Sequence, residues 1–308
     1  MSVSNQILTA SAVRTASESK SVTHTLRSFI VLAKPEITLM VMISAGFASL
    51  MASDSLRIIV LVHTVVGIGL LSAGASVLNQ FLEREPDGRM RRTARRPLPA
   101  GDLTAHQAFV FGVALSFVGM LYVLLLLNVL TALLGLLTLI SYVFIYTPLK
   151  TKTSFCTFVG AFPGAAPVLM GWSAATNSLT LEAAALYAIL FLWQFPHFYA
   201  IGWLYRDDYA RAGMLMLPAR EANDGRTTFR LILISTQLLI IASLLLTFIA
   251  HTGTLYLVSA IILGISFYYF AYHAAQSRSK VAAKRLLHAS VIYLPLLYLF
   301  VLLDKVIR

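Results

Sequence analysis

Apolar runs of about 17 to 25 residues recur along this chain of 308 residues, and this is the length that a helix needs to cross a bilayer. A soluble protein would break so much apolar sequence into shorter amphipathic pieces. The composition agrees, since 58% of the residues are hydrophobic and only 12% are charged. The sequence therefore predicts an all-α integral membrane protein whose helices pack together.

We predict nine transmembrane helices, an odd number that places the two termini on opposite sides of the membrane. The predicted spans are 37–53, 58–81, 106–127, 129–147, 155–175, 181–203, 229–250, 254–275 and 286–303. Only Asn128, Val129 and Thr131 mark a boundary between the third and fourth spans. The apolar run 109–146 is too long for one span, so two helices are expected.

The basic residues fall almost entirely on one side of this arrangement. If the N-terminus lies inside, the only basic residues outside, of 24 in the chain, are Arg57, Lys305 and Arg308. Segments on the cytoplasmic side carry an excess of Lys and Arg, so the bias predicts the N-terminus inside and the C-terminus outside. The net charge of +11 then reflects the topology of the chain and its contact with anionic lipid. Nucleic-acid binding is not expected, because no long soluble domain presents the charges.

The N-terminal segment 1–35 is rich in Ser and Thr and lacks the apolar core of a secretory signal. We predict that it is a mobile cytoplasmic tail and that residues 36–308 form a single nine-helix domain. A bacterial inner membrane is favoured over a mitochondrial one, because the tail is short and contains Glu18. The single cysteine, Cys156, excludes an internal disulfide and a cysteine metal cluster.

Most of the 13 carboxylates lie in two predicted inside loops, 82–105 and 204–228, or at the helix ends beside them. At the first loop, Asn79, Glu83 and Asp87 repeat every four residues, which aligns them on one stripe of a helix. Like charges at this spacing repel unless a cation lies between them, and oxygen ligands suit Mg²⁺. The alternative is a solvated helix end held by nearby arginines.

The second loop carries Asp207 and Asp208 between Arg206 and Arg211. Alone, this pattern is more typical of an ordinary charged loop. Two acidic helix ends on the same side, each interleaved with arginines, fit Mg²⁺ ions that bridge carboxylates to a diphosphate held by guanidinium groups. Such a site would ionise an allylic diphosphate.

Seven segments carry motifs beyond the pattern of spans. They are 34–36, 79–87, 91–99, 146–150, 195–198, 207–213 and 290–296. Together they resemble the UbiA superfamily of intramembrane prenyltransferases over nearly all of the chain beyond the tail. Glu83 stands where the superfamily usually has Asp, as in its heme-modifying branch. Quinone-type members have two Asp four residues apart in the second motif, but Tyr205 and Tyr209 stand at the corresponding places here.

The resemblance implies a nine-helix bundle around a central cavity capped by the two acidic loops. It implies transfer of the farnesyl group of farnesyl diphosphate to a vinyl group of heme b, with addition of water, to give heme O. Mg²⁺ is the implied cofactor, whereas heme b and farnesyl diphosphate are substrates. The bilayer is the surrounding partner, and heme A synthase or assembly factors of terminal oxidases are further expected partners.

The resemblance also implies roles for single residues. The expected catalytic residues are Asn79, Glu83, Asp87 and Asp208. The residues expected to hold Mg²⁺ through the diphosphate are Asn79, Glu83, Asp87, Asp207 and Asp208. The candidates for binding diphosphate or heme propionates, each of which would also satisfy the positive-inside tendency, are Arg92, Arg96, Lys150, Arg206 and Arg211.

One histidine, His197, lies in the inner half of the sixth span. An intramembrane histidine is a functional candidate, here for a place near the heme. The alternative is a histidine that is only hydrogen-bonded within the bundle. In the fifth span, Gly164 and Pro167 fit either close helix packing or a broken helix beside a cavity.

Three other functions compete with the heme-modifying one. A transporter would place polar groups near the bilayer midplane, but the carboxylates here gather at one interface. A quinone-type prenyltransferase is disfavoured by Glu83, by the stretch 92–99 and by the missing second Asp pair. A membrane scaffold for oxidase assembly would need no metal site and would tolerate the loss of Glu83.

Overall fold

The computed structural model describes residues 22–53, 55, 57–221 and 224–308. Within these residues, nine helical segments are long and apolar enough to cross a membrane. They are α3 (Pro35–Ala52), α4 (Ile58–Leu82), α6 (Ala105–Leu126), the continuous run Val129–Leu149, α9 (Cys156–Thr176), α10 (Leu181–Leu204), α13 (Arg226–Ile249), α14 (Thr254–Ser277) and α15 (Lys280–Ile307). The predicted all-α fold with nine spans is therefore confirmed, with most boundaries shifted by a few residues.

The fourth span changes its helix type along its length. It comprises α7 (Val129–Ile140), the π-helical turn η1 (Ser141–Tyr146) and the short α8 (Thr147–Leu149). The predicted break before it is present, because the Asn128 side chain caps α7 by accepting a hydrogen bond from Thr131 N at 2.8 Å. Asn128 also donates to the carbonyl of Ser173 at 2.7 Å, which ties the break to α9.

The last span is longer than its apolar core. Helix α15 begins at Lys280, whereas the predicted span began at residue 286. Ser279 caps it by accepting a hydrogen bond from Ala282 N at 3.2 Å, so the basic segment forms the first turns of the helix. Hydropathy finds only the part of the helix that lies in hydrocarbon.

Part of the segment predicted as a tail is helical. Helix α2 covers Val22–Leu32, and Leu32 is fully buried. Gln80 on α4 donates its side-chain amide to the carbonyl of Leu32 at 2.6 Å. The helical structure thus begins before the predicted boundary at residue 36, because an apolar helix too short for a span still packs on the bundle. The mobility predicted for residues 1–21 concerns residues outside those described.

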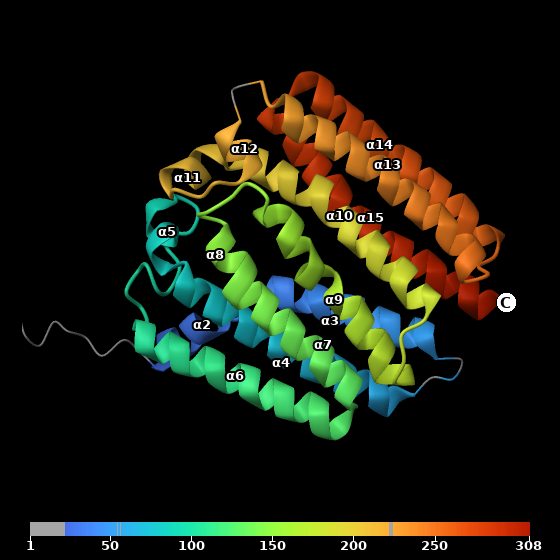
Figure 1. Cartoon of the computed structure of the whole chain (residues 1–308), viewed down its shortest axis with the longest axis horizontal. Coiled ribbons are helices and arrows are strands. Elements are labelled where there is room, and N and C mark those ends of the chain that lie inside the picture. Colours follow the sequence, from blue (N-terminus) through green and yellow to red (C-terminus); the bar gives the residue numbers. More distant parts are fainter. Residues whose placement is uncertain (1–21, 54, 56, 222–223) are drawn as a thin grey trace, which may run out of the picture.

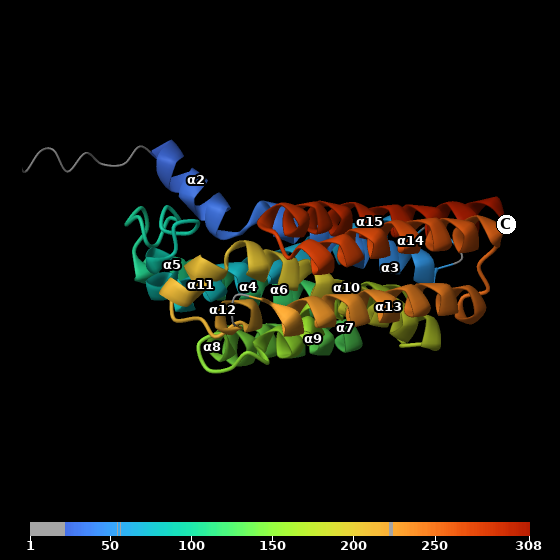
Figure 2. The ribbon, with the colours of Figure 1, turned by 90° about the horizontal axis from the view of Figure 1, so that it is seen from above.

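The short helices gather at one end of the bundle. Helices α5 (Arg84–Arg89), α11 (Arg206–Arg211) and α12 (Leu217–Arg220) lie together there, and the C-terminus lies at the opposite end (Figure 1). Figure 2 shows α2 and α8 at the same end as α5 and α11. The two acidic loops are therefore neighbours in space, as expected.

The first and last spans close the bundle. Helix α3 packs against both α4 and α9, and it also contacts α15. Phe47 on α3 stacks on Tyr298 on α15, with ring centroids 3.9 Å apart. Helix α10 contacts α9, α13 and α15, so the two halves of the chain share one continuous helical core.

Helix α9 runs unbroken from Cys156 to Thr176 although Pro163 and Pro167 lie inside it. Its glycines serve close packing. A Cβ atom on Gly171 would collide with the backbone carbonyl of Ala45 on α3, and backbone cannot move aside as a flexible side chain would. The close approach of α9 and α3 therefore depends on the missing side chain.

We expect Gly171→Ala to destabilise the protein by about 1–3 kcal/mol, as overpacking a close contact does. Thermal unfolding in detergent checks this as a lowered transition midpoint. Gly88→Ala is the matched control, since a Cβ there would meet only Pro99 Cβ at 3.9 Å, an ordinary contact. Equal midpoints for the two variants would contradict the packing argument.

Candidate active site

Three acceptor residues form a buried row where α4 ends and α5 begins. Asn79, Glu83 and Asp87 are 1%, 7% and 1% exposed. Glu83 N donates to Asn79 O at 2.9 Å, and Asp87 N donates to Glu83 O at 2.8 Å. These bonds keep a four-residue register through the junction, so the structure brings the three side chains predicted from sequence together.

Each carboxylate of this row faces a cation from another segment. Lys150 Nζ lies 2.7 Å from Glu83 Oε1, and Arg96 Nη1 lies 2.7 Å from Asp87 Oδ2. Burial disfavours the charge on Lys150, but the Glu83 carboxylate and nearby tyrosines together raise the pKa of Lys150 well above its ordinary value. Lys150 is therefore a permanent cation beside the acidic row.

The amide of Asn79 is held from both sides. Its Oδ1 accepts a hydrogen bond from Lys34 Nζ at 2.8 Å, and its Nδ2 donates to Thr147 Oγ1 at 3.0 Å. Burial, aided by the charge of Arg96, lowers the pKa of Lys34 to about 7. The prediction from sequence did not include Lys34 among the site residues, although the resemblance included the Lys-Pro-Glu segment 34–36.

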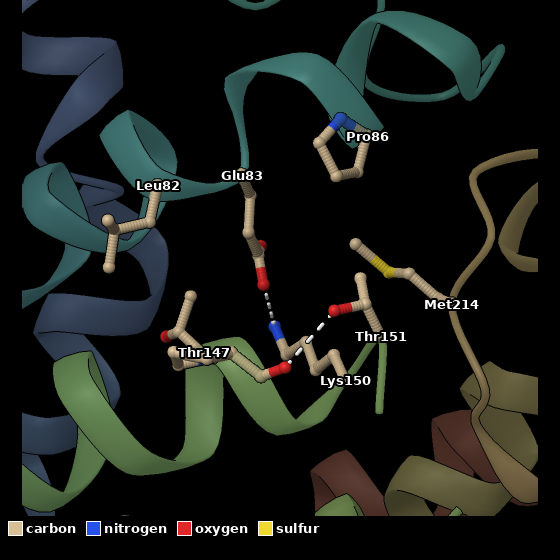
Figure 3. A pocket seen from close by; sticks show the side chains of 8 residues that line it. Leu82, Glu83, Pro86, Thr147, Lys150, Thr151 and Met214 are labelled. Atoms are coloured by element: carbon tan, nitrogen blue, oxygen red, sulfur yellow. Dashed lines mark hydrogen bonds and ion pairs between the residues drawn. The ribbon is translucent and has the colours of Figure 1, made fainter. Parts of the chain in front are cut away.

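A pocket of about 220 Å³ opens beside this row. Glu83 and Lys150 meet across it, while Pro86 and Met214 line another side (Figure 3). Met214 belongs to the loop that follows α11, so the pocket lies between the first and second acidic loops. A polar ligand bound here would touch both loops.

The residues of the row fit a divalent cation. Asp87 Oδ1 is buried and has no hydrogen-bond partner among the described residues. Buried carboxylate oxygens without partners are costly, and a hard cation such as Mg²⁺ would satisfy them. The described part of the chain contains no group of three or more His, Cys, Asp or Glu side chains able to hold a metal. A metal here would need ligands from a substrate, such as diphosphate oxygens.

The two aspartates of the second loop lie in different environments. Asp208 is buried and pairs with Arg211. Asp207 is 61% exposed and pairs with Lys280 at 2.8 Å. The hydrogen bond from Lys280 holds the pKa of Asp207 below its ordinary value. Only Asp208 therefore shares the burial of the first row.

Arg92 joins the two loops. Its guanidinium lies 4.8 Å from the centre of the Tyr205 ring, and its Nη2 donates to the Tyr209 hydroxyl at 3.3 Å. These are the two tyrosines that the resemblance placed where quinone-type members have aspartates. The Arg92 guanidinium of the first loop thus lies over the rings of Tyr205 and Tyr209 in the second, and this cation–π contact is favourable at partly buried sites.

Arg206 lies over the ring of Trp203, with its guanidinium carbon 4.4 Å from the ring centre. Its Nε is 3.8 Å from Asp207, and its Nη1 is buried without a hydrogen-bond partner among the described residues. The side chain therefore keeps a donor available for an anionic ligand.

His197 is hydrogen-bonded within the bundle. Its Nδ1 lies 2.8 Å from Ser290 Oγ on α15, and its ring stacks on Trp193. His197 is thus bonded within the bundle, as the alternative prediction from sequence had it. Its expected place near the heme stays a prediction.

Comparison with known proteins identifies the family. The sequence pattern of the UbiA prenyltransferase family matches residues 39–295, most of the chain. The chain belongs to the UbiA prenyltransferase family. The predicted family and its membrane-embedded prenyltransferase character are therefore confirmed.

UbiA-family relatives match nearly the full length. The chain is 46% identical over 290 residues to a protoheme IX farnesyltransferase of Solibacter usitatus, covering 91% of this chain and 99% of the relative. It is 42% identical over 293 residues to the protein of the same name from Koribacter versatilis, covering 92% and 94%.

Solved UbiA-family structures share the fold. A digeranylgeranylglyceryl phosphate synthase superposes with a TM-score of 0.76 at 17% identity, covering 92% of this chain and 99% of that one. A UbiA homolog from Archaeoglobus fulgidus bound to GPP and Mg²⁺ gives a TM-score of 0.59 at 11% identity, covering 89% and 99%. At these identities the likeness concerns the fold alone.

The contrast between the two aspartates predicts unequal effects. We expect Asp208→Asn to lower prenyl transfer by roughly 100-fold or more, as loss of a preorganised charge at a phosphate site does. Asp207→Asn should stay within about fivefold of the intact enzyme, since exposed ion pairs contribute at most ~1 kcal/mol. Steady-state turnover of the two matched variants checks this, and equal losses would contradict the assignment.

The buried pair also predicts a stability effect. Lys150→Met leaves Glu83 as an unpaired buried charge and should destabilise the protein by about 3–5 kcal/mol. Adding Glu83→Gln removes that charge, so the double variant should recover much of the stability without recovering activity. Thermal unfolding and turnover of the two variants, each compared with the intact protein, separate pairing from catalysis. A double variant as unstable as Lys150→Met would contradict the pairing argument.

Proposed function

We propose that this UbiA-family prenyltransferase transfers the farnesyl group of farnesyl diphosphate to a vinyl group of heme b, giving heme O and diphosphate. The observation that carries the proposal is the similarity, over nearly the whole chain, to relatives named protoheme IX farnesyltransferase. The buried row of Asn79, Glu83 and Asp87 supplies a place for the diphosphate, and Glu83 agrees with the heme-modifying branch.

In the proposed reaction, the bond between the farnesyl C1 and the diphosphate oxygen breaks, and its electron pair leaves with the diphosphate. The terminal vinyl carbon forms a bond to C1, which leaves positive charge on the inner vinyl carbon. Water adds there and loses a proton, giving a hydroxyethylfarnesyl group. The apolar wall of a helical bundle would keep other water from the allylic cation.

The chain's own residues would bind and orient the leaving group. Mg²⁺, when bound, would neutralise the diphosphate and make it a better leaving group. Asn79, Glu83 and Asp87 would hold the metal through their oxygens, and support comes from the buried Asp87 Oδ1 without a partner and from the UbiA homolog solved with GPP and Mg²⁺. Lys150 and Arg96 already lie beside the row and would donate to diphosphate oxygens.

The remaining cations would extend this binding site. Arg206 keeps a buried donor available, while Arg92 of the first loop lies beside Tyr209 and Arg211 of the second loop pairs with Asp208. These three are candidates for the second phosphate or for heme propionates, which are anions that guanidinium groups bind in pairs of hydrogen bonds. Asp207 is proposed as a weaker metal ligand than Asp208, because its carboxylate already forms an ion pair with Lys280.

The protein would work in a bacterial inner membrane with its acidic loops on the cytoplasmic side. The bias of basic residues toward the segments at this end supports the orientation. Residues 36–308 would form the catalytic domain. The product would pass to heme A synthase or to assembly factors of terminal oxidases.

Mass spectrometry of extracted hemes tests the function. Membranes containing the intact chain, supplied with heme b, farnesyl diphosphate and Mg²⁺, should form heme O. Glu83→Gln should abolish it, since the buried row then loses a metal-binding carboxylate, whereas Glu85→Gln at an exposed neighbouring position should not. Unmodified heme b with folded protein would overturn the heme assignment, and aromatic quinone precursors would be the next acceptors to test.

A further inference from the structure

A chain of hydrogen bonds crosses from α10 to α15 at His197. The ring Nδ1 lies 2.8 Å from Ser290 Oγ, and Ser290 Oγ lies 2.7 Å from the carbonyl oxygen of Leu287. Ser290 is fully buried, so water does not compete for these bonds. The two helices that carry them pack directly on one another.

The chain fixes where the imidazole proton lies. A serine hydroxyl has one proton, and a carbonyl oxygen can only accept. If Ser290 gave its proton to His197, its oxygen would face the Leu287 oxygen at 2.7 Å with no proton between two acceptors. Ser290 therefore donates to Leu287, and Nδ1 of His197 donates to Ser290. The imidazole is the Nδ1–H tautomer, with its lone pair on Nε2.

Trp193 fixes the plane of the same ring. It stacks on His197 with centroids 4.5 Å apart and planes 22° from parallel, one helical turn earlier on α10. Its Nε1 donates to the backbone carbonyl of Ser290 at 2.8 Å. One residue of α15 thus anchors both rings, and no described residue forms a hydrogen bond with His197 Nε2.

We infer that His197 Nε2 binds the iron of the heme substrate and that Ser290 is the positioning residue that sets its tautomer. Histidines that bind metals almost always donate their other ring N–H to an acceptor, which fixes tautomer and orientation as Ser290 does here. Imidazole nitrogen is a common axial ligand of heme iron. The inference rests on the proposed function, because it needs heme as the substrate.

The position along α10 suits a substrate that reaches the acidic loops. His197 lies roughly 11 Å along the helix axis from the end of α10 at Leu204, at 1.5 Å per residue. A porphyrin bound by its iron there would lie between the middle of the bundle and the loops that hold the diphosphate. The ligand would keep the reacting vinyl group at a fixed depth.

Optical and EPR spectra of the full-length protein with heme b, without farnesyl diphosphate, test the ligand. The intact protein should give the spectrum of histidine-bound heme. His197→Gly should lose it, and added imidazole should restore it. His63→Gly is the matched control, because His63 is also half-buried and bonded to a hydroxyl, that of Tyr122 at 2.8 Å. A His197→Gly spectrum identical to the intact protein's would overturn the inference.

Variants of Ser290 test the positioning role. Ser290→Ala should weaken heme binding by about 10-fold or more, as loss of the partner of a metal-bound histidine does, and should alter the spectrum. Ser290→Thr keeps the hydroxyl and should restore both. If neither variant folds, ¹⁵N NMR of histidine-labelled intact protein without heme still decides the tautomer, and an Nε2–H signal for His197 would overturn the role of Ser290.

The outcomes also separate the inference from the proposed function. Histidine-bound heme without formation of heme O would leave the ligand in place and remove the farnesyl transfer. Formation of heme O by His197→Gly with an unchanged heme spectrum would support the farnesyl transfer and overturn His197 as the iron ligand.

Discussion

The row of buried oxygen acceptors at one end of the bundle, Asn79, Glu83 and Asp87, needs hydrogen-bond and charge partners from other segments of the chain. Glu83 and Asp87 carry charge below the surface, and an uncompensated buried charge costs several kcal/mol. Basic side chains reach the row from segments far apart in sequence: Lys34 before α3, Arg96 after α5 and Lys150 after α8. Pairing thus ties three spans and a loop into one unit. The same basic side chains would suit the anionic diphosphate of the proposed reaction, so the contacts that hold the row together would also bind that group.

Much of the fold could be predicted because the bilayer constrains sequence strongly. Hydrocarbon thickness sets the length of each span, and the break at Asn128 was visible because a capping side chain must interrupt an apolar run. The stripe of Asn79, Glu83 and Asp87 followed from helical periodicity alone. Helix α2 was missed for the same reason that the spans were found, since its apolar face is too short to cross the membrane.

Features that depend on contacts between distant segments could not be predicted. Asp207 and Asp208 are adjacent in sequence, and the packing of α11 against α10 and α12 leaves one exposed and the other buried. The bond between His197 and Ser290 joins residues on different spans, which no local pattern records. Lys34 belonged to a predicted motif but was not assigned to the site, because its hydrogen bond to Asn79 joins residues remote in sequence.

The π-helical turn Ser141–Tyr146 lies in the fourth span between α7 and the residues that lead to Lys150. It holds one residue more per hydrogen-bonded ring than an α-helix does, so the residues after it are rotated by about 100° relative to an uninterrupted helix. Lys150 follows this turn, and its Nζ lies 2.7 Å from Glu83 Oε1. A residue gained or lost inside the turn would rotate Lys150 by about 100° about the helix axis, away from the acid. The position of Lys150 at the site therefore depends on the length of this turn.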